Sequence, residues 1–216
     1  MKNCNMTLNK HIILRELHKS DREKLESLIC EEWNYEKYCC PQVAAKFARV
    51  YLNSCLAEQT YTQVAIIDNV PVGIVMVKNL KVHKCPLAIR LQLLLSTISL
   101  YLSKEGRKIA KIYECEDVAD KELLMQCKKE YQGELSFFIV SPEYRGKGIG
   151  KLLFQKAIDY MYSQKISEFF LFTDTNCNYS FYEHLGMKRK CIKDYDFEEN
   201  NHSKKISFFI YDYCIQ

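Results

Sequence analysis

The sequence predicts an α/β (α+β) protein with a mixed central sheet of about seven strands, flanking helices, and a helical insertion between the third and fourth strands. Three observations predict this fold. Short segments with alternating or continuous apolar side chains, typical of strands, are interspersed with helical patterns. A glycine-rich turn joins one apolar segment to an amphipathic one. Residues 81–132, between the third and fourth predicted strands, show helical patterns only.

The composition is that of a soluble globular protein. Of 216 residues, 48% are apolar and 27% charged, which predicts one domain over residues 1–216 with the insertion at about 81–132. The net charge of +4 is small, and the nearest approach to a basic block is Lys188–Lys190. We therefore expect no nucleic-acid partner.

The cysteines indicate free thiols. Their number, eleven, is odd, and their spacing follows no disulfide framework. Neither they nor the five histidines complete a zinc spacing, so no metal is expected. Residues 1–10 are polar and show no secretory signal, which favours the reducing cytoplasm. Leu87–Leu102 is apolar but too short for a membrane span, so no membrane is expected.

The first third of the chain predicts a strand, two helices and a hairpin. His11–Leu17 alternates apolar and polar residues, as a strand does. A helix follows, with Ser20 as the predicted N-cap, and a second begins at Pro41 and continues to Leu56. Two strands then flank the turn Asp68–Pro71, at Thr62–Ile67 and Val72–Lys78.

The insertion predicts two helices, near Leu87–Lys104 and Val118–Tyr131, with a break at Gly106. The first helix is apolar on most faces and must therefore be covered. The insertion as a whole either covers a binding site or forms the face of a homodimer. The second helix is expected to be solvent-exposed, with polar residues Asp117, Asp120, Lys121, Glu122, Lys128 and Lys129.

The remaining elements follow in quick succession. Leu135–Val140 is apolar almost throughout and predicts a central strand. After the glycine turn, a helix is predicted from Gly148 to about Gln164. Four further elements are a strand at Glu168–Thr173, a short helix at Asn178–Leu185, and strands at Met187–Phe197 and Lys205–Tyr213, the last two joined by a loop at Glu198–Ser203.

The segment Arg145-Gly-Lys-Gly-Ile-Gly150 carries the most specific chemistry. Its glycines allow backbone N–H groups to converge at the positive end of the next helix, an anion site suited to a pyrophosphate. It is one residue short of the Walker spacing, with Leu152 in place of the hydroxyl residue, and its spacing differs from the dinucleotide motif. The alternative is an ordinary glycine turn.

This segment resembles the acetyl-CoA motif of the GNAT N-acetyltransferases. The surroundings are similar too: a strand ending in Val-Ser-Pro precedes the loop, and Phe181-Tyr182 precedes Gly186. The resemblance is strong over Glu134–Lys188, weaker over His11–Lys78, and absent in the insertion. It implies transfer of an acetyl group from acetyl-CoA to a primary amine, by direct attack in a ternary complex.

The resemblance also implies roles for particular residues. The pyrophosphate would bind the main chain of residues 145–151, namely Arg145, Gly146, Lys147, Gly148, Ile149, Gly150 and Lys151. The pantetheine arm would pair with the main chain of Ile139, Val140 and Ser141. The Asn frequent in the family is here Thr175, with Asn176 and Asn178 close by, and of these Asn178 is the expected cofactor contact.

The implied catalytic residues are Tyr182 and Glu134. Tyr182 would protonate the departing thiolate, its alternative being a packed aromatic beside Phe181. Glu134 would accept the amine proton, its alternative being a surface residue at a strand end. Asp174 is the second candidate base, or it caps a turn.

The acceptor side is predicted at Glu31–Glu36, where three carboxylates and two aromatic rings suit a small-molecule or peptide amine. The alternative is a solvated helix end with Trp33 in the core. Two other functions are weighed against acetyl transfer: a non-catalytic acyl-CoA-binding sensor or scaffold of the same fold, and an enzyme that modifies nucleic acid or ribosomal proteins.

Overall fold

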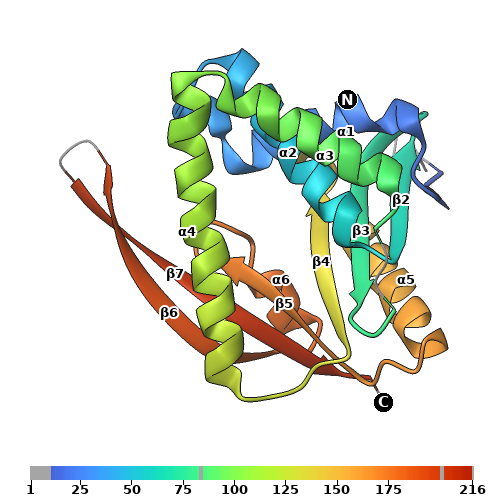
Figure 1. Cartoon of the computed structure of the whole chain (residues 1–216). Helices are drawn as coiled ribbons and strands as arrows, with labels where there is room; N and C mark the ends of the chain where they lie inside the picture. Colours follow the sequence, from blue (N-terminus) through green and yellow to red (C-terminus); the bar gives the residue numbers. More distant parts are fainter. Residues whose placement is uncertain (1–10, 83–84, 200–201, 216) are drawn as a thin grey trace, which may run out of the picture.

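The computed structural model describes residues 11–82, 85–199 and 202–215. Across these residues, seven strands form one mixed sheet in the order β1-β2-β3-β4-β5-β7-β6. Figure 1 shows the strands flanked by helices, with the long helix α4 crossing in front of the sheet. The predicted fold class and the central position of the fourth strand are confirmed.

The strands are close to the predicted segments. The first strand is shorter than the predicted His11–Leu17, whereas most of the others extend by one or two residues because backbone pairing continues beyond the apolar side chains. Their bounds are β1 (Ile13–Arg15), β2 (Tyr61–Ile67), β3 (Val70–Asn79), β4 (Gly133–Val140), β5 (Glu168–Asp174), β6 (Lys188–Glu199) and β7 (His202–Cys214). The last two strands thus take up most of the loop expected at 198–203, of which residues 200 and 201 lie outside the described chain.

The helices cover both faces of the sheet. They are α1 (Arg22–Trp33), α2 (Pro41–Glu58), α3 (Leu87–Tyr101), α4 (Lys104–Cys127), α5 (Ile149–Ser163) and α6 (Ser180–His184). Helices α1 and α2 pack on one face against β3 and β4, and α4 continues that layer over β6 and β7. Helix α5 packs on the opposite face, against β2, β3 and β4. The sheet is therefore buried between two helical layers.

The start of α1 differs from the prediction. Ser20 lies within a short 3-10 turn, Lys19–Asp21, and is not the N-cap. The Asp21 carboxylate instead accepts hydrogen bonds from the His18 N–H at 2.8 Å and from the Arg15 guanidinium. Asp21 is the N-cap residue of α1, but its side chain accepts no hydrogen bond from the first turn of the helix and instead fixes the preceding chain.

The insertion also differs from the prediction. The second helix begins at Lys104 and not near Val118, because Ser103 caps it by accepting from the Gly106 N–H at 2.9 Å. Gly106 thus lies inside the first turn of α4 and is not a break. A Cβ there would be 2.0 Å from the Leu100 carbonyl, so glycine permits the tight corner between α3 and α4.

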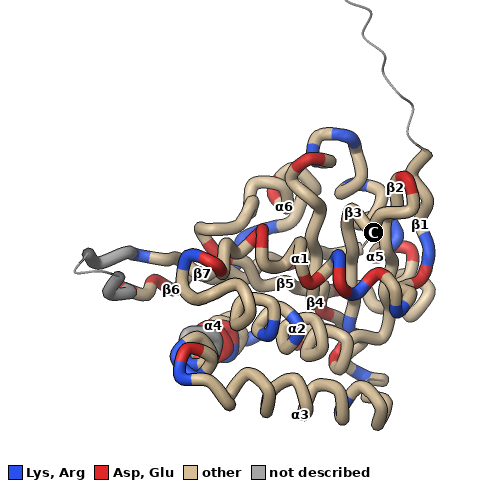
Figure 2. The backbone as a smooth tube through the Cα atoms, turned by 90° about the horizontal axis from the view of Figure 1, so that it is seen from above, with Lys and Arg blue, Asp and Glu red and all other residues tan. Residues whose placement is uncertain are grey.

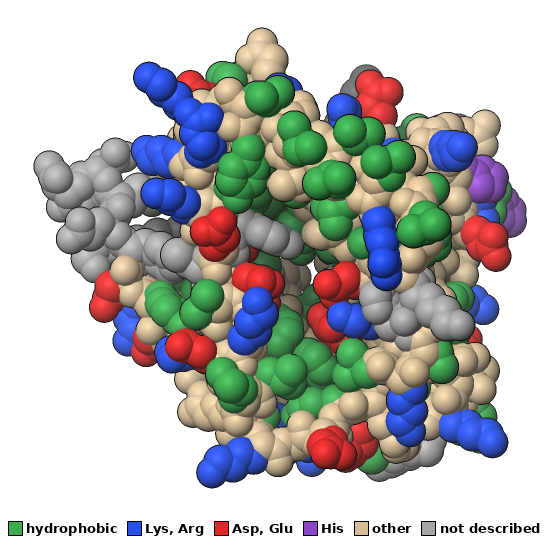
Figure 3. All heavy atoms as spheres, viewed as in Figure 1, with side chains coloured by type: hydrophobic (Ala, Val, Ile, Leu, Met, Phe, Trp, Pro, Cys, Tyr) green, Lys and Arg blue, Asp and Glu red, His purple; other side chains and the backbone are tan. Residues whose placement is uncertain are grey.

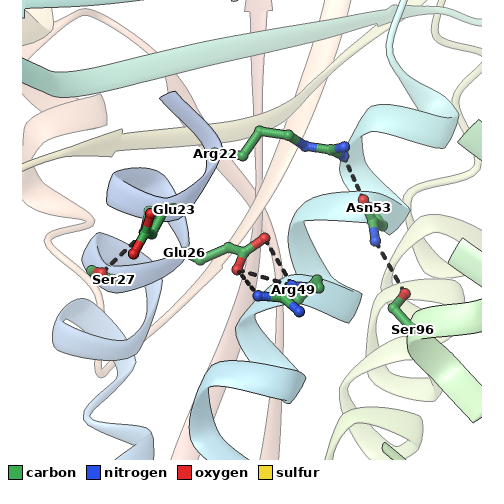
Figure 4. A network of polar contacts seen from close by, with 7 residues as sticks. All are labelled: Arg22, Glu23, Glu26, Ser27, Arg49, Asn53 and Ser96. Atoms are coloured by element: carbon green, nitrogen blue, oxygen red, sulfur yellow. Dashed lines mark hydrogen bonds and ion pairs between the residues drawn. The ribbon is translucent and has the colours of Figure 1, made fainter. Parts of the chain in front are cut away.

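Helix α3 packs on the outer side of α2, away from the sheet, as Figure 2 shows. A polar network joins the three helices α1, α2 and α3: Asn53 accepts from the Arg22 guanidinium and donates to Ser96 Oγ at 3.1 Å (Figure 4). The outer face of α3 is apolar and exposed within this chain, with Leu87 81% and Leu95 58% exposed. Within the described part of this chain, α3 is therefore covered only on the side that faces α2.

Helix α4 is not uniformly solvent-exposed, contrary to expectation. Ala119 and Leu123 are fully buried against the β5 and β7 side chains Phe170, Phe208 and Ile210. The Cys127 and Cys191 Sγ atoms lie 2.9 Å apart, and Glu122 pairs with Lys193. One face of α4 is therefore fixed against the sheet, while Asp117 and Lys121 pair on the outside.

Candidate active site

The site begins where the sheet divides. Parallel strands β4 and β5 pair only at Gly133 with Phe169 and at Glu134 with Phe170. Beyond these pairs the two strands diverge, while β4 stays paired with β3 on its other side as far as Val140. The edge of β4 that faces β5 therefore has no strand partner beyond Glu134, and its backbone can pair with an extended ligand.

A cavity of about 210 Å³ lies in this division of the sheet. It reaches from the end of α1 and from Tyr51 within α2, past β4, to the glycine loop and α6. Its lining is largely apolar and aromatic, with a few polar groups, as is typical of small-molecule sites. Among the lining residues are Trp33, Tyr51, Phe137, Phe138, Val140, Gly146, Gly150, Phe172, Thr173 and Tyr182.

The glycine loop connects β4 to α5 at one end of the cavity. Gly146 and Gly148 have φ values of 76° and 81°, which side chains rarely tolerate, and Gly148 is the N-cap of α5. A Cβ at either glycine would meet no atom within 4 Å, so the space above the loop is open. The first N–H groups of α5 have no intrahelical partner, so they can donate hydrogen bonds to an anion placed above the loop.

Gly150 is needed for packing. A Cβ at this position would lie 2.9 Å from Cζ of Phe181, whose ring stacks on Phe138 with centroids 5.4 Å apart. The glycine thus lets α6 approach α5, and it brings Tyr182 to the cavity beside the loop. This explains why the Phe-Tyr pair and the glycine loop occur together in the sequence.

Arg145 spans the cavity mouth. Its Nε donates to the Val140 carbonyl at 3.1 Å, and its guanidinium pairs with Glu32 of α1. The arginine therefore links the loop to the opposite helical layer. Its charge lies between the glycine loop and the edge of β4.

Comparison with known proteins agrees with this geometry. A model of the Acetyltransferase (GNAT) family matches residues 22–187. The chain belongs to the GNAT acetyltransferases. It is therefore an acyltransferase, and the recognition made from the glycine loop is confirmed.

Solved structures share the fold at low sequence identity. PaiA N-acetyltransferase from Thermoplasma acidophilum, in complex with coenzyme A, is 17% identical with a TM-score of 0.52, over 94% of this chain and 99% of that one. A GNAT acetyltransferase from Streptococcus pneumoniae is 14% identical, TM-score 0.53, over 95% and 100%. Ard1 from Thermoplasma volcanium is 11% identical, TM-score 0.52, over 95% and 98%. A search of curated proteins returns no match.

Tyr182 lines the cavity of this GNAT fold. Its ring packs between Phe138 and Tyr211, with centroids 6.3 Å and 6.2 Å away. Burial raises the pKa of the phenol well above its usual value, and the nearby Cys177 and Glu32 raise it further. The phenol therefore stays protonated at neutral pH and is available as a proton donor.

Glu134 lies at the start of β4, on the side of the sheet that carries α2 and α4. A β-bulge places Leu135 and Ser136 opposite Val77 alone. The bulge keeps Glu134 and Phe137 on the same face. Burial raises the pKa of Glu134 to about 7, although Lys78 lowers it. A carboxyl group with this pKa exchanges protons readily at neutral pH, as a general base must.

Asp174, the other candidate base, closes a turn after β5. Its carboxylate accepts from the Asn176 N–H at 2.5 Å and from the Cys177 thiol at 3.7 Å. Burial raises its pKa, while these hydrogen bonds lower it. Asp174 thus serves the turn that carries Cys177 to the cavity wall.

The structure brings most of the predicted site residues together. Those that line the cavity are Ile139, Val140, Arg145, Gly146, Ile149, Gly150, Asn178 and Tyr182. Ser141, Lys147, Gly148, Lys151 and Glu134 are not part of this lining. The Ser141 N–H donates to the Val72 carbonyl at 2.8 Å, and Lys147 Nζ to the Glu143 carbonyl at 3.0 Å.

Segment 31–36 was predicted either to bind the amine or to be a solvated helix end, and the structure shows features of both. Glu32 and Trp33 line the cavity, whereas Glu31 and Glu36 are exposed. Trp33 also packs against Tyr51 and Phe137, with centroids 5.2 Å and 6.2 Å away. It is therefore both a packed aromatic and a wall of the cavity.

Sequence reasoning missed several residues near the site. Tyr51, Phe138 and Phe172 line the cavity, but in the sequence they are ordinary apolar positions of a helix and two strands. Glu116 and Asp120 of α4 belong to the insertion, which has no counterpart in the family pattern. Their spacing of four residues, which places them on one helix face, was the only signal.

No helix within the described ranges is both long and apolar enough to cross a bilayer. No group of three or more His, Cys, Asp or Glu side chains suited to a metal ion occurs among the same residues.

Proposed function

We propose that this protein transfers an acetyl group from acetyl-CoA to a primary amine by direct attack in a ternary complex. The observation that carries the proposal is the cavity between β4 and β5, which joins the glycine loop to Tyr182 along the unpaired edge of β4. An extended pantetheine arm fits such an edge, and a pyrophosphate fits the start of α5.

The main chain of Ile139 and Val140 would bind the pantetheine arm. The loop residues Gly146–Lys151 would hold the pyrophosphate, with Arg145 beside them. The Ser141 N–H is already engaged by Val72, so Ser141 would contribute through its carbonyl or hydroxyl. Asn178 lines the cavity and accepts from Ser180 Oγ at 2.9 Å, which fixes its side chain.

In the reaction, the amine nitrogen attacks the thioester carbonyl carbon. The new C–N bond forms as the C–S bond breaks, and the thiolate takes up a proton. Tyr182, whose phenol is protonated at neutral pH, would supply that proton. Glu134 would accept the proton lost by the amine, directly or through water.

The alternative function, a non-catalytic acyl-CoA-binding sensor or scaffold, would need the same cavity but neither ionisable group. The position of Tyr182 in the cavity wall, and a buried carboxyl at Glu134 that a binding module does not need, favour catalysis.

We further infer one transferase domain over residues 1–216, with residues 81–132 as its insertion, located in the cytoplasm. The exposed apolar face of α3 supports a homodimer, since large apolar patches mark interaction surfaces.

The test is release of the CoA thiol from acetyl-CoA in the presence of a panel of amines, with Tyr182→Phe as comparison. We expect amine-dependent release and a kcat lower by about 100-fold in the variant. Binding of acetyl-CoA without release for any amine would favour the sensor.

A further inference from the structure

Helix α4 brings acidic side chains to the acceptor side of the site. Glu116 and Asp120 lie one turn apart and share the inward face with Ala119 and Leu123, which are fully buried. Asp117 points to the outside, where its side chain is 62% exposed. The helix thus presents two carboxylates toward the divided sheet.

The sheet presents two more. Asp174 shares a face of β5 with Phe170 and Phe172, because side chains alternate along a strand, and Phe170 packs against α4. Glu134 is in register with Phe170. Asp120 interacts electrostatically with Glu116, Asp117, Glu134 and Asp174. Helix periodicity, strand alternation and register place Glu116, Asp120, Glu134 and Asp174 on the α4 side of the sheet, and these four residues are here called the acidic wall.

The space-filling view agrees. Figure 3 shows a hollow beside α4, with apolar side chains at its floor and Asp and Glu side chains around its opening, next to Lys and Arg side chains. The floor suits methylene groups, and the rim suits ammonium groups.

Few cationic side chains pair with the carboxylates of the acidic wall. Among the described residues, no hydrogen bond or ion pair joins the carboxylates of Glu116, Asp120 or Glu134 to a cation. Lys78 is near Glu134 but pairs with Glu58 at 2.7 Å. By contrast, Glu122 on another face of α4 pairs with Lys193. Crowded carboxylates without partners are costly unless a cation or protons neutralise them.

An independent observation lies in the cavity wall. Ser136 Oγ is shielded from solvent and has no hydrogen-bond partner. It belongs to the β4 bulge two residues after Glu134 and lines the cavity. A buried hydroxyl without a partner in a ligand-sized cavity indicates a polar ligand group that pairs with it.

We propose that the acceptor is an aliphatic diamine or polyamine, held by the acidic wall through a second ammonium group while the reacting amine lies near Glu134 and Ser136. This inference rests on the proposed function. The carboxylates face inward under α4, which favours a slender small molecule over a protein surface. The aromatic side chains of Phe137 and Phe172 in the cavity wall suit the methylene chain between the nitrogens.

The first measurement is binding, which does not depend on turnover. Calorimetry with CoA present compares spermidine with butylamine, and the double variant Glu116→Gln/Asp120→Asn with the matched control Asp117→Asn. We expect spermidine to bind the parent and the control at least about 10-fold more tightly than the double variant. Equal spermidine affinity in all three proteins would overturn the proposal.

The second measurement is kcat/KM. We expect kcat/KM for spermidine to exceed that for butylamine by at least about 10-fold in the parent and in the Asp117→Asn control, and the double variant to lose this preference. Turnover of butylamine without a preference for spermidine would overturn the acceptor class and leave the proposed function intact. A preference for a lysine-containing peptide over spermidine would overturn the small-amine assignment. Spermidine binding without turnover of any amine would support the acidic wall and contradict the transferase.

Discussion

The two sides of the cavity are built differently. The proposed cofactor side comes from consecutive residues, the end of β4, the loop 141–148 and the start of α5, and would act mainly through its backbone. The acceptor side comes from α1, α2, α4 and two strands, and acts through side chains. Backbone sites need glycine at fixed positions, whereas side-chain sites need only that distant elements meet. The first kind therefore leaves a compact motif and the second does not.

The largest effect that would separate the two sides is expected from Glu134→Gln. Loss of the base should lower kcat by about 100-fold while KM for acetyl-CoA changes little. In the parent, kcat/KM should rise with pH through about 7, because Glu134 must lose its proton to act. Plots of kcat/KM against pH for the parent and the variant check this. If the rise near pH 7 is unchanged in Glu134→Gln, a group other than Glu134 causes it.

Glu58→Gln is the matched control for this experiment. It removes a negative charge that raises the Glu134 pKa and releases Lys78 from its pair with Glu58. Both changes lower the Glu134 pKa. The rise of kcat/KM should thus occur at lower pH in Glu58→Gln, while the maximal rate remains close to that of the parent.

An intermediate effect is expected on the cofactor side from Gly150→Ala. The added Cβ would be 2.9 Å from Phe181 and would push that ring toward the cavity. KM for acetyl-CoA should rise several-fold, by about 1 kcal/mol of binding. A second variant, Gly150→Ala/Phe181→Leu, should recover part of the loss because it relieves the contact. No change in KM, or no recovery, would contradict the packing role of Gly150.

The smallest effect is expected on stability, from Asp120→Asn on the acceptor side. Burial, with the charges of Glu116 and Glu134, raises the Asp120 pKa to about 8. The folded protein therefore binds more protons than the unfolded chain between the ordinary Asp pKa and about 8, and stability falls as pH rises through this window. The variant should melt a few degrees higher than the parent at about pH 9, with no gain at about pH 4. Melting curves across pH check this, and a pH-independent difference would contradict it.

The contrast between a backbone site and a side-chain site also explains which parts of the fold and of the site can be predicted from the sequence. Strand alternation and helix spacing locate nearly all elements, and the loop at Arg145–Gly150 with Phe181-Tyr182 indicates the cofactor side. The start of α4 was missed because its signal, Ser103 before a charged stretch, is weaker than the nearby glycine. The inward carboxylates of α4 were missed because their surroundings come from strands far away in the chain.

The central claim is that the division between β4 and β5 is the acetyl-CoA site, and thermal unfolding with acetyl-CoA tests it most directly. Ligand at about 100 times its dissociation constant should add about 2.7 kcal/mol to the unfolding free energy. We expect a rise of several degrees with acetyl-CoA, a smaller rise for Gly150→Ala at the same concentration, and none with ATP. No rise at millimolar acetyl-CoA would contradict the assignment of this cavity.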